Sequence, residues 1–128
     1  MEKKILVIDN DININGLIKS VLETKKGYSV DFALSGKEGL KKLKSDQYDL
    51  VLLDLTMPEV SGVDVCKFMN HDDELKDIPV LIVSAMPINS KEFQQENDNF
   101  QNFPIVKGLI EKPFEVEDLL KKVEGVLA

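Results

Sequence analysis

Residues 48–62 read YDLVLLDLTMPEVSG and form the most regular stretch of this chain. Its apolar run, residues 50–53, is typical of a strand that is buried on both faces of a parallel sheet. The run ends in Asp54, after which Pro58 and Gly62 indicate a loop. Asp often ends strands for structural reasons alone, so Asp54 is either a boundary residue or a functional acid. Ligands of open α/β sheets bind at the carboxyl ends of the strands, so polar residues ending other strands would favour a functional acid.

Length and composition are those of a globular protein. A chain of 128 residues can bury a substantial core, and we expect residues 1–128 to form a single domain. No segment approaches the roughly 18 apolar residues of a membrane span, and the apolar run at residues 5–8 is too short for a signal peptide. The single cysteine, Cys66, cannot form an internal disulfide, which fits a reducing compartment. We therefore expect a cytoplasmic protein with no membrane partner.

The charge balance argues against direct binding of nucleic acid. The chain carries 23 acidic and 16 basic residues, for a net charge of -7, and every basic residue is Lys. Neutralising the phosphates of a nucleic acid requires a basic face, which an acidic chain without Arg does not provide. We therefore expect this chain to act on other partners.

Strand and helix patterns alternate along the whole chain. Strands are predicted at residues 4–8, 29–33, 50–53, 79–83 and 106–110. Four helices are predicted from inward-facing apolar residues: Ile14, Leu17, Ile18, Val21 and Leu22; Leu40 and Leu43; Val65, Cys66 and Met69; and Val116, Leu119, Leu120, Val123 and Leu127. The predicted boundaries are an end near Gly27 for the first, a capping box of Ser35 and Glu38 for the second, and a cap at Ser61 for the third. With a fifth helix at about residues 90–96, followed by a long loop, the pattern predicts an α/β fold with a parallel sheet and helices on both faces.

Four of the five predicted strands end in polar or charged residues. These are Asp9, followed by Asn10 and Asp11; Asp54; Ser84; and, in the loop after the last strand, Lys112. Carboxylates that converge at one edge repel each other, and a hard cation such as Mg²⁺, which binds one or two carboxylates and keeps several waters, relieves this repulsion. A hydroxyl and an ammonium beside such a centre suit the oxygens of a phosphoryl group. Because carboxylates can form acyl phosphates, Asp54 is the predicted nucleophile.

Four motifs give the chain a resemblance to the receiver domain of two-component response regulators. They are residues 5–11, residues 49–58 with Gly62, residues 79–85 and residues 112–114, in the order and spacing of that family. The likeness covers nearly the whole chain. It implies a flavodoxin-like (βα)5 fold, which is a three-layer sandwich around a five-stranded parallel sheet of order 2-1-3-4-5.

For the reaction, the resemblance implies that Asp54 accepts a phosphoryl group from a phosphohistidine of a sensor histidine kinase or a phosphotransfer protein. Ser84 would hydrogen-bond the phosphoryl oxygens, Lys112 would pair with them, and the Lys112–Pro113 bond is expected to be cis. Residues 84–112 would relay the state to a downstream protein or a fused output domain, and the face of the fourth helix, fifth strand and fifth helix could form a homodimer. Such a domain is a phosphoacceptor and not an enzyme, apart from slow loss of its own phosphoryl group.

For the metal, the resemblance implies a Mg²⁺ ion held by Asp9, Asn10, Asp54 and the backbone carbonyl of Thr56, with Asp11 as a further candidate. The family usually has two acids at the end of the first strand, where this chain has Asp9 and Asn10. An amide oxygen can ligate Mg²⁺ but lacks the negative charge of a carboxylate. We therefore predict weaker Mg²⁺ binding than is usual in the family.

Three further differences from the family concern the lifetime of the phosphorylated state and its coupling to the output. Leu109 stands at the position of an aromatic residue whose ring swings inward in the family, and a Leu cannot make the same contact, so we expect a different output coupling. The segment from Ser84 to Lys112 is longer than in the family and lacks a Gly-Ala step, which predicts an unusual partner or fourth helix. Met86 is bulky and apolar, which predicts slow hydrolysis of the acyl phosphate because water is excluded.

Three other functions compete with this interpretation. A phosphatase of the haloacid dehalogenase type also uses a strand-end Asp and Mg²⁺, but it needs a second acid two residues later, where this chain has Thr56. A receiver-like binding module that signals without phosphorylation stays open because of Asn10, Leu109 and the atypical segment after Ser84. A nucleotide or flavin site is set aside, since no Gly-rich phosphate loop follows the first strand.

Overall fold

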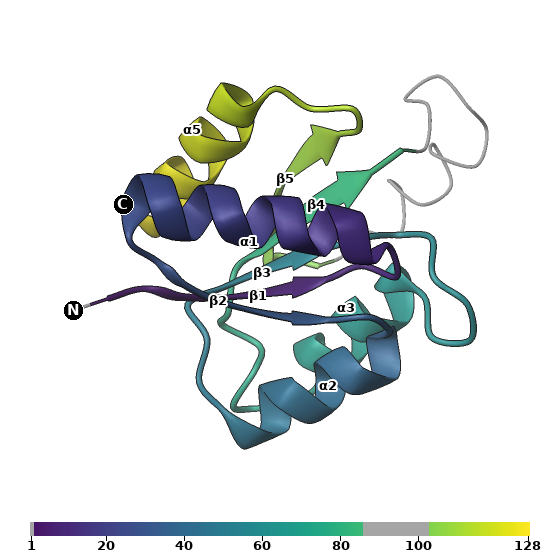
Figure 1. Ribbon diagram of the computed structural model, residues 1–128. Coiled ribbons are helices and arrows are strands. Elements are labelled where there is room, and N and C mark those ends of the chain that lie inside the picture. Colours follow the sequence, from purple (N-terminus) through teal and green to yellow (C-terminus); the bar gives the residue numbers. More distant parts are fainter. Residues whose placement is uncertain (1, 86–102) are drawn as a thin grey trace.

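A five-stranded parallel sheet forms the centre of the computed structural model, which describes residues 2–85 and 103–128 (Figure 1). The strands are β1 (Lys4–Ile8), β2 (Ser29–Ala33), β3 (Leu50–Leu53), β4 (Val80–Ser84) and β5 (Val106–Glu111). The described residues contain four helices, α1 (Ile12–Lys26), α2 (Gly36–Ser45), α3 (Gly62–Asn70) and α5 (Val116–Leu127). The strand order is β2-β1-β3-β4-β5, which confirms the predicted flavodoxin-like fold.

The predicted strand bounds are confirmed at β1, β2 and β3 and differ at the other two strands. β4 begins one residue later than predicted, at Val80, because Pro79 has no N–H to give to the ladder. The carbonyl of Pro79 still accepts a hydrogen bond from Val51 at 3.0 Å. At their other ends β4 and β5 each extend one residue further than predicted, and Ser84 pairs with Glu111. Ser84 is therefore part of the sheet rather than the first residue beyond it.

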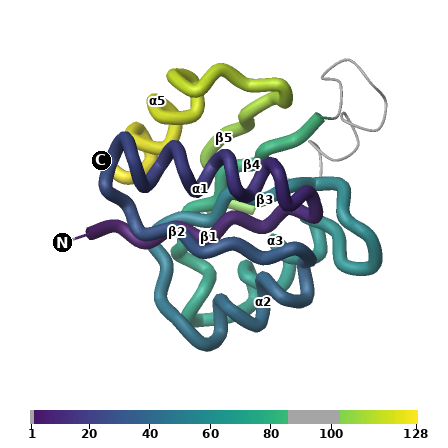
Figure 2. The backbone as a smooth tube through the Cα atoms, viewed as in Figure 1, coloured from purple at the N-terminus to yellow at the C-terminus, as the bar shows by residue number. Residues whose placement is uncertain are grey.

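Helices cover both faces of the sheet, α1 and α5 on one face and α2 and α3 on the other (Figures 1 and 2). Strand side chains alternate between two cores. The α1/α5 core includes Ile5, Val7, Leu50, Leu52, Leu81 and Val83, with Ile18, Leu22, Leu119 and Val123 of the helices. The α2/α3 core includes Leu6, Ile8, Val51, Leu53, Val80 and Ile82, with Leu43, Val65, Cys66 and Met69 of the helices. The three central strands are thus buried on both faces, which explains their continuous apolar runs.

Side-chain caps fix the starts of α2 and α3. Ser35 accepts a hydrogen bond from the Glu38 N–H at 3.1 Å, as predicted. The Glu38 carboxylate, however, accepts from the N–H of Leu34 at 3.1 Å, one residue before the cap, so the reciprocal half of the predicted capping box is displaced. α3 begins with a complete box, in which Ser61 and Asp64 cap each other's N–H groups.

The buried side of α1 differs from the predicted one at Leu17, which is 46% exposed. The buried residues of this helix are Asn15, Ile18 and Leu22, at the spacing of three and four residues that defines one helical face. Leu17 lies beside that line, on the flank of the helix. A polar residue, Asn15, therefore occupies a core position that the apolar pattern did not predict. The helix ends as predicted near Gly27, which has a φ of 68°.

The predicted helix at about residues 90–96, the long loop after it and Met86 lie outside the described residues. In residues 2–85 and 103–128, no helix combines the length and the apolar character that crossing a membrane requires.

Candidate functional site

Two acids lie side by side at the carboxyl edge of the sheet. Asp9 follows β1 and Asp54 follows β3, and these neighbouring strands are in register, with Ile8 opposite Leu53. The Asp54 N–H donates to the carbonyl of Ile8 at 2.9 Å, which joins the two strand ends. Asp9 is 2% exposed and Asp54 is 6% exposed. The register therefore brings together two buried carboxylates that the sequence predicted at one edge.

Lys112 and Ser84 complete this edge from β5 and β4. The Lys112 Nζ lies 2.6 Å from Asp9 Oδ2 and 4.0 Å from Asp54 Oδ1. Its backbone N–H donates to the carbonyl of Ser84 at 2.8 Å, and the predicted cis peptide bond between Lys112 and Pro113 is confirmed. Ser84 is buried at the end of β4, the strand next to β3. The four predicted residues thus lie at the ends of four consecutive strands of the sheet.

Burial raises the pKa of the Asp54 carboxyl. Removal from water and the nearby charge of Asp9 raise the pKa of the Asp54 carboxyl to about 6, and the opposing effects of Lys112 and of the N–H groups of Thr56 and Leu55 are smaller. The Thr56 N–H lies 3.4 Å from Asp54 Oδ1. At neutral pH this carboxylate is therefore ionised but poorly solvated and beside a like charge. Such a group is suited to act as a nucleophile or a metal ligand.

The loop after Asp54 packs against the backbone of that residue. A Cβ at position 62 would lie 2.6 Å from the Asp54 carbonyl oxygen and 2.9 Å from Leu55 Cα, so only Gly62 allows α3 to begin here. The Gly62 N–H donates to the Leu55 carbonyl at 3.1 Å. Within the same loop Glu59 has a φ of 67°, a left-handed conformation that is unfavourable for a residue with a Cβ. The sequence indicated Gly62 only as a loop residue, because its contact with Asp54 depends on where α3 packs.

Asp11, two residues after Asp9, stabilises the local fold. One carboxylate oxygen of Asp11 caps α1, accepting from the N–H of Asn13 at 2.9 Å and of Ile14 at 3.4 Å. The Asp11 N–H donates to Asp9 Oδ1 at 2.9 Å. Asn10, between them, is exposed. The structure therefore engages Asp11 in helix capping and in holding Asp9.

The donor atoms at this edge fit Mg²⁺. No group of three or more His, Cys, Asp or Glu side chains with metal-binding geometry occurs in the part of the chain that the structure describes. Mg²⁺ needs only one or two carboxylates, because waters and carbonyl oxygens supply its other ligands. Asp9 and Asp54 offer the carboxylates, and the exposed residue Thr56 offers a backbone carbonyl. The binding of Mg²⁺ by these residues stays a prediction.

One polar residue of the site was not predicted. Asn15 is fully buried on α1, and its Nδ2 donates to the carbonyl of Asp9 at 2.8 Å. The only signal in the sequence was an amide one residue after Ile14 and three before Ile18, within the apolar face of a helix. Such an amide has no assignable partner until the strand ends are placed.

Leu109, at the position of the family's aromatic residue, lies on β5. It is half-buried and packs against the α2/α3 core. Its carbonyl accepts a hydrogen bond from the Lys122 Nζ of α5. That Leu109 couples phosphorylation to output differently from the family's aromatic residue stays a prediction.

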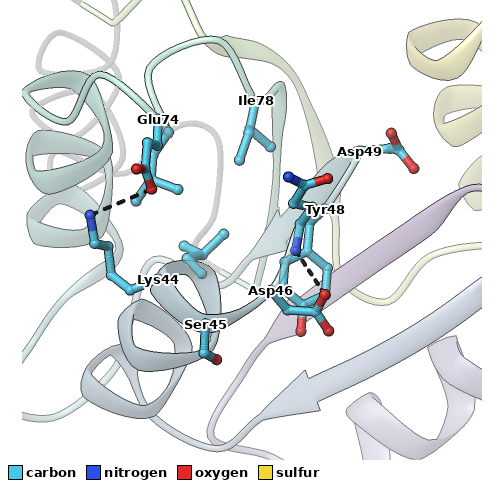
Figure 3. Close-up of a pocket in the computed structure, with 10 residues that line it drawn as sticks. Lys44, Ser45, Asp46, Tyr48, Asp49, Glu74 and Ile78 are labelled. Atoms are coloured by element: carbon cyan, nitrogen blue, oxygen red, sulfur yellow. Dashed lines mark hydrogen bonds and ion pairs between the residues drawn. The ribbon is translucent and has the colours of Figure 1, made fainter.

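A large hollow lies at the opposite edge of the sheet and does not mark the site. This pocket of about 660 Å³ is lined by Tyr48 and Asp49, which directly precede β3, and by Lys44 and Glu74, which approach each other at 3.9 Å (Figure 3). None of the residues predicted to bind a phosphoryl group or Mg²⁺ lines it. The site is therefore identified by its buried charges and not by the size of a cavity.

Comparison with known proteins identifies the family. The family model described as "Response regulator receiver domain" matches residues 5–124. The chain belongs to this family, as the sequence motifs predicted.

Among curated proteins, the chain is 36% identical over 125 residues to the DNA-binding dual master transcriptional regulator RpaA of Synechocystis sp., covering 97% of this chain and 48% of RpaA. The chain spans about half the length of the first curated relatives that it matches. Among solved structures, it is similar to chemotaxis protein CheY4 of Vibrio cholerae, with a TM-score of 0.87 and 28% identity over 99% of this chain and 100% of that chain. It is also similar to response regulator protein TrrA of Thermotoga maritima in complex with Mg²⁺-BeF, with a TM-score of 0.81 and 32% identity over 98% and 99% of the two chains.

Proposed function

We propose that this chain is the phosphoacceptor of a two-component phosphorelay and that Asp54 is the residue that becomes phosphorylated. The observation that carries the proposal is the buried group of Asp54, Asp9 and Lys112, in which two carboxylates share one ammonium. Membership of the receiver family supports it. So does the similarity to TrrA, whose structure is described as a complex with Mg²⁺-BeF.

In the proposed reaction an oxygen of the Asp54 carboxylate forms a bond to phosphorus while the phosphorus–nitrogen bond of a donor phosphohistidine breaks. The electron pair of that bond stays on the imidazole nitrogen, which takes a proton from water. Asp54 must be ionised to attack, and a pKa of about 6 leaves it mostly ionised at neutral pH. Its burial restricts the access of water, which favours a long-lived acyl phosphate.

Asp9, Asn10, Asp54 and the Thr56 carbonyl would hold Mg²⁺. When bound, the ion neutralises charge on the carboxylates and on the transferred oxygens. Lys112 neutralises Asp9 and stands 4.0 Å from Asp54 Oδ1, so a small movement of its flexible side chain would bring it to a phosphoryl oxygen on Asp54.

Ser84 would donate its hydroxyl to another phosphoryl oxygen, from the end of the strand adjacent to β3. With Lys112 on one oxygen and Ser84 on another, the transferred group would be held by donors from two strands.

The proposed partners follow from the same role. The donor would be a sensor histidine kinase or a phosphotransfer protein in the cytoplasm. The recipient of the signal would be a downstream protein, a fused output domain or a second copy of this chain. In this proposal the chain is not an enzyme beyond slow loss of its own phosphoryl group.

The experiment is incubation of the protein with acetyl phosphate and Mg²⁺, followed by intact mass spectrometry. We expect a mass increase of one phosphoryl group that is absent in Asp54→Asn. The matched control is Asp49→Asn, which removes an exposed acid just before β3, where it accepts a hydrogen bond from the Lys4 N–H at 2.8 Å. This control should be phosphorylated like the wild type. No uptake by the wild type, or uptake that persists in Asp54→Asn, would overturn the proposal.

The second candidate is a receiver-like module that signals by binding alone, and the exposed, uncharged Asn10 favours it. The same experiment separates the two functions. A binding module would take up no phosphoryl group and would hold its partner equally well as wild type and as Asp54→Asn.

A further inference from the structure

Every polar atom of Asp9 is held in place. Its N–H donates to the carbonyl of Ala33 at 3.1 Å. Its carboxylate accepts from the Asp11 N–H at 2.9 Å through Oδ1 and from Lys112 at 2.6 Å through Oδ2. Its carbonyl accepts from the Nδ2 of Asn15 at 2.8 Å. Of these four anchors, Asn15 is the one neutral side chain, so it can be replaced without changing the charge of the site.

The orientation of the Asn15 amide is fixed by its acceptors. Nδ2 donates to the carbonyl of Asp9 at 2.8 Å and approaches that of Ala33 at 3.4 Å. Turning the amide over would place its oxygen against these two carbonyls, which offer no hydrogen. Asn15 therefore links α1 to the ends of β1 and β2 through donated hydrogen bonds.

Asn15 is the one polar residue among the buried residues of α1. Asn15 is fully buried, and its Oδ1 has no hydrogen-bond partner within residues 2–85 and 103–128. A buried acceptor without a partner lowers stability, and the hydrogen bonds that Nδ2 donates offset this cost. The other buried residues of α1, Ile18 and Leu22, are apolar, so the amide of Asn15 is set apart by its hydrogen bonds to the strand ends.

We propose that Asn15 is a positioning residue for Asp9. By holding the Asp9 carbonyl it fixes the end of β1 so that the carboxylate faces Lys112 and Asp54, and it thereby sets the affinity of the site for Mg²⁺. The effect should be large in this chain because Asn10 supplies no charge, which leaves Asp9 as the acid on which the β1 side of the site depends. The inference about affinity rests on the proposed function.

The test uses Asn15→Leu, which keeps the branched shape and the number of side-chain heavy atoms and removes the donor. The matched control is Asn13→Leu, which replaces an exposed amide two residues earlier on the same helix. Mg²⁺ affinity is measured by calorimetry, and the ¹³C resonance of the Asp9 carboxyl is measured in metal-free protein. We expect about tenfold weaker Mg²⁺ binding and a shifted Asp9 resonance in Asn15→Leu, in the range known for residues that orient metal ligands. Asn13→Leu should match the wild type in both measurements.

Mg²⁺ affinity within about twofold of wild type, together with an unchanged Asp9 resonance, would overturn the inference. If the role of Asn15 were only structural, Asn15→Leu would be less stable to urea in chelator, and its Mg²⁺ affinity and Asp9 resonance would match those of the wild type. If Asn15→Leu does not fold, Asn15→Ser, which can donate one hydrogen bond, should give a smaller loss of affinity in the same direction. If the wild type binds no Mg²⁺, the proposed function fails, and the Asp9 resonance of the metal-free variants still decides the role of Asn15.

Discussion

The two edges of the sheet each place a lysine against aspartates, in opposite surroundings. At the amino edge Lys4 pairs with Asp46, and the two side chains are 29% and 47% exposed. The hydrogen bond from Lys4 lowers the pKa of Asp46. At the carboxyl edge Lys112 also faces aspartates, but burial and the charge of Asp9 raise the pKa of Asp54 to about 6.

This difference shows that burial and a neighbouring like charge can reverse the direction in which a lysine would shift the pKa of an aspartate. Water solvates both members of the exposed pair, so the attraction of the lysine is the largest remaining effect. At the buried edge the loss of hydration of Asp54, together with the nearby charge of Asp9, outweighs the attraction of Lys112. An additional positive charge would therefore stabilise the buried carboxylates of the carboxyl edge, whereas the exposed pair at the amino edge would gain little from it.

The largest expected difference between the two edges is the loss of stability when the lysine of each is replaced. Lys112→Met leaves Asp9 and Asp54 buried without a cation, and we expect the free energy of unfolding in chelator at about pH 8 to fall by about 3 kcal/mol. Lys4→Met, the matched control at the amino edge, should change it little. Urea unfolding followed by circular dichroism measures both. Equal losses in the two variants would contradict the comparison.

Asp54→Asn should stabilise the protein, by about 2 kcal/mol at pH 8 in chelator. The folded pKa of Asp54, about 6, lies above its ordinary value of 3.8, so the folded state binds this proton more tightly than the unfolded state does. The stabilisation that comes from this tighter proton binding is fully present below about pH 4 and is lost as the pH rises through 6. Urea unfolding across this window should show wild type losing stability relative to Asp54→Asn. Asp46→Asn, whose acid has a lowered pKa, should change stability in the opposite direction.

Restoring a second acid to the β1 end should raise the Mg²⁺ affinity. We expect Asn10→Asp to bind Mg²⁺ about tenfold more tightly, because a carboxylate replaces an amide beside Asp9. Calorimetry measures the affinity. Asn13→Asp adds the same charge to the first turn of α1, away from Asp9, and should have little effect. Indistinguishable affinities for wild type and Asn10→Asp would remove the idea.

The smallest expected effects come from two residues with nearly the same backbone conformation. Glu59, in the loop after Asp54, has a φ of 67°, and Gly27, at the end of α1, has a φ of 68°. We expect Glu59→Gly to raise the free energy of unfolding and Gly27→Ala to lower it, each by about 1 kcal/mol. Thermal unfolding of the two variants tests this, and changes of the same sign would contradict it.

Most of the sheet could be predicted from the sequence because β1, β3 and β4 are buried on both faces. The sequences of such strands are continuous apolar runs, and a polar residue then marks where each strand ends. The sequence alone could therefore place Asp9 and Asp54 at one edge of the sheet. The strand order came from the resemblance to the receiver family, since periodicity does not specify which strands are neighbours.

What could not be predicted depends on contacts between elements. Leu17 fits the apolar period of α1, yet the helix turns Asn15 and not Leu17 toward the sheet. Asp11 looks like a metal ligand beside Asp9, but one of its oxygens is engaged by the first turn of α1. The contact of Gly62 with the Asp54 backbone exists only because α3 starts against that loop. The contacts of each of these residues depend on how helices and loops pack at the edge of the sheet, which the local sequence does not specify.

The sheet divides the buried residues into the α1/α5 core and the α2/α3 core, and no described residue belongs to both. A methyl group lost from one core leaves a cavity on one side of the sheet, and the backbone of the strands separates that cavity from the side chains of the other core. Neighbours in the chain such as Leu6 and Val7, which lie in different cores, should therefore be less coupled in evolution than Val7 and the distant Leu119, which belong to the same core. Among related chains, correlated substitutions are expected to fall into two sets that interleave along every central strand without mixing.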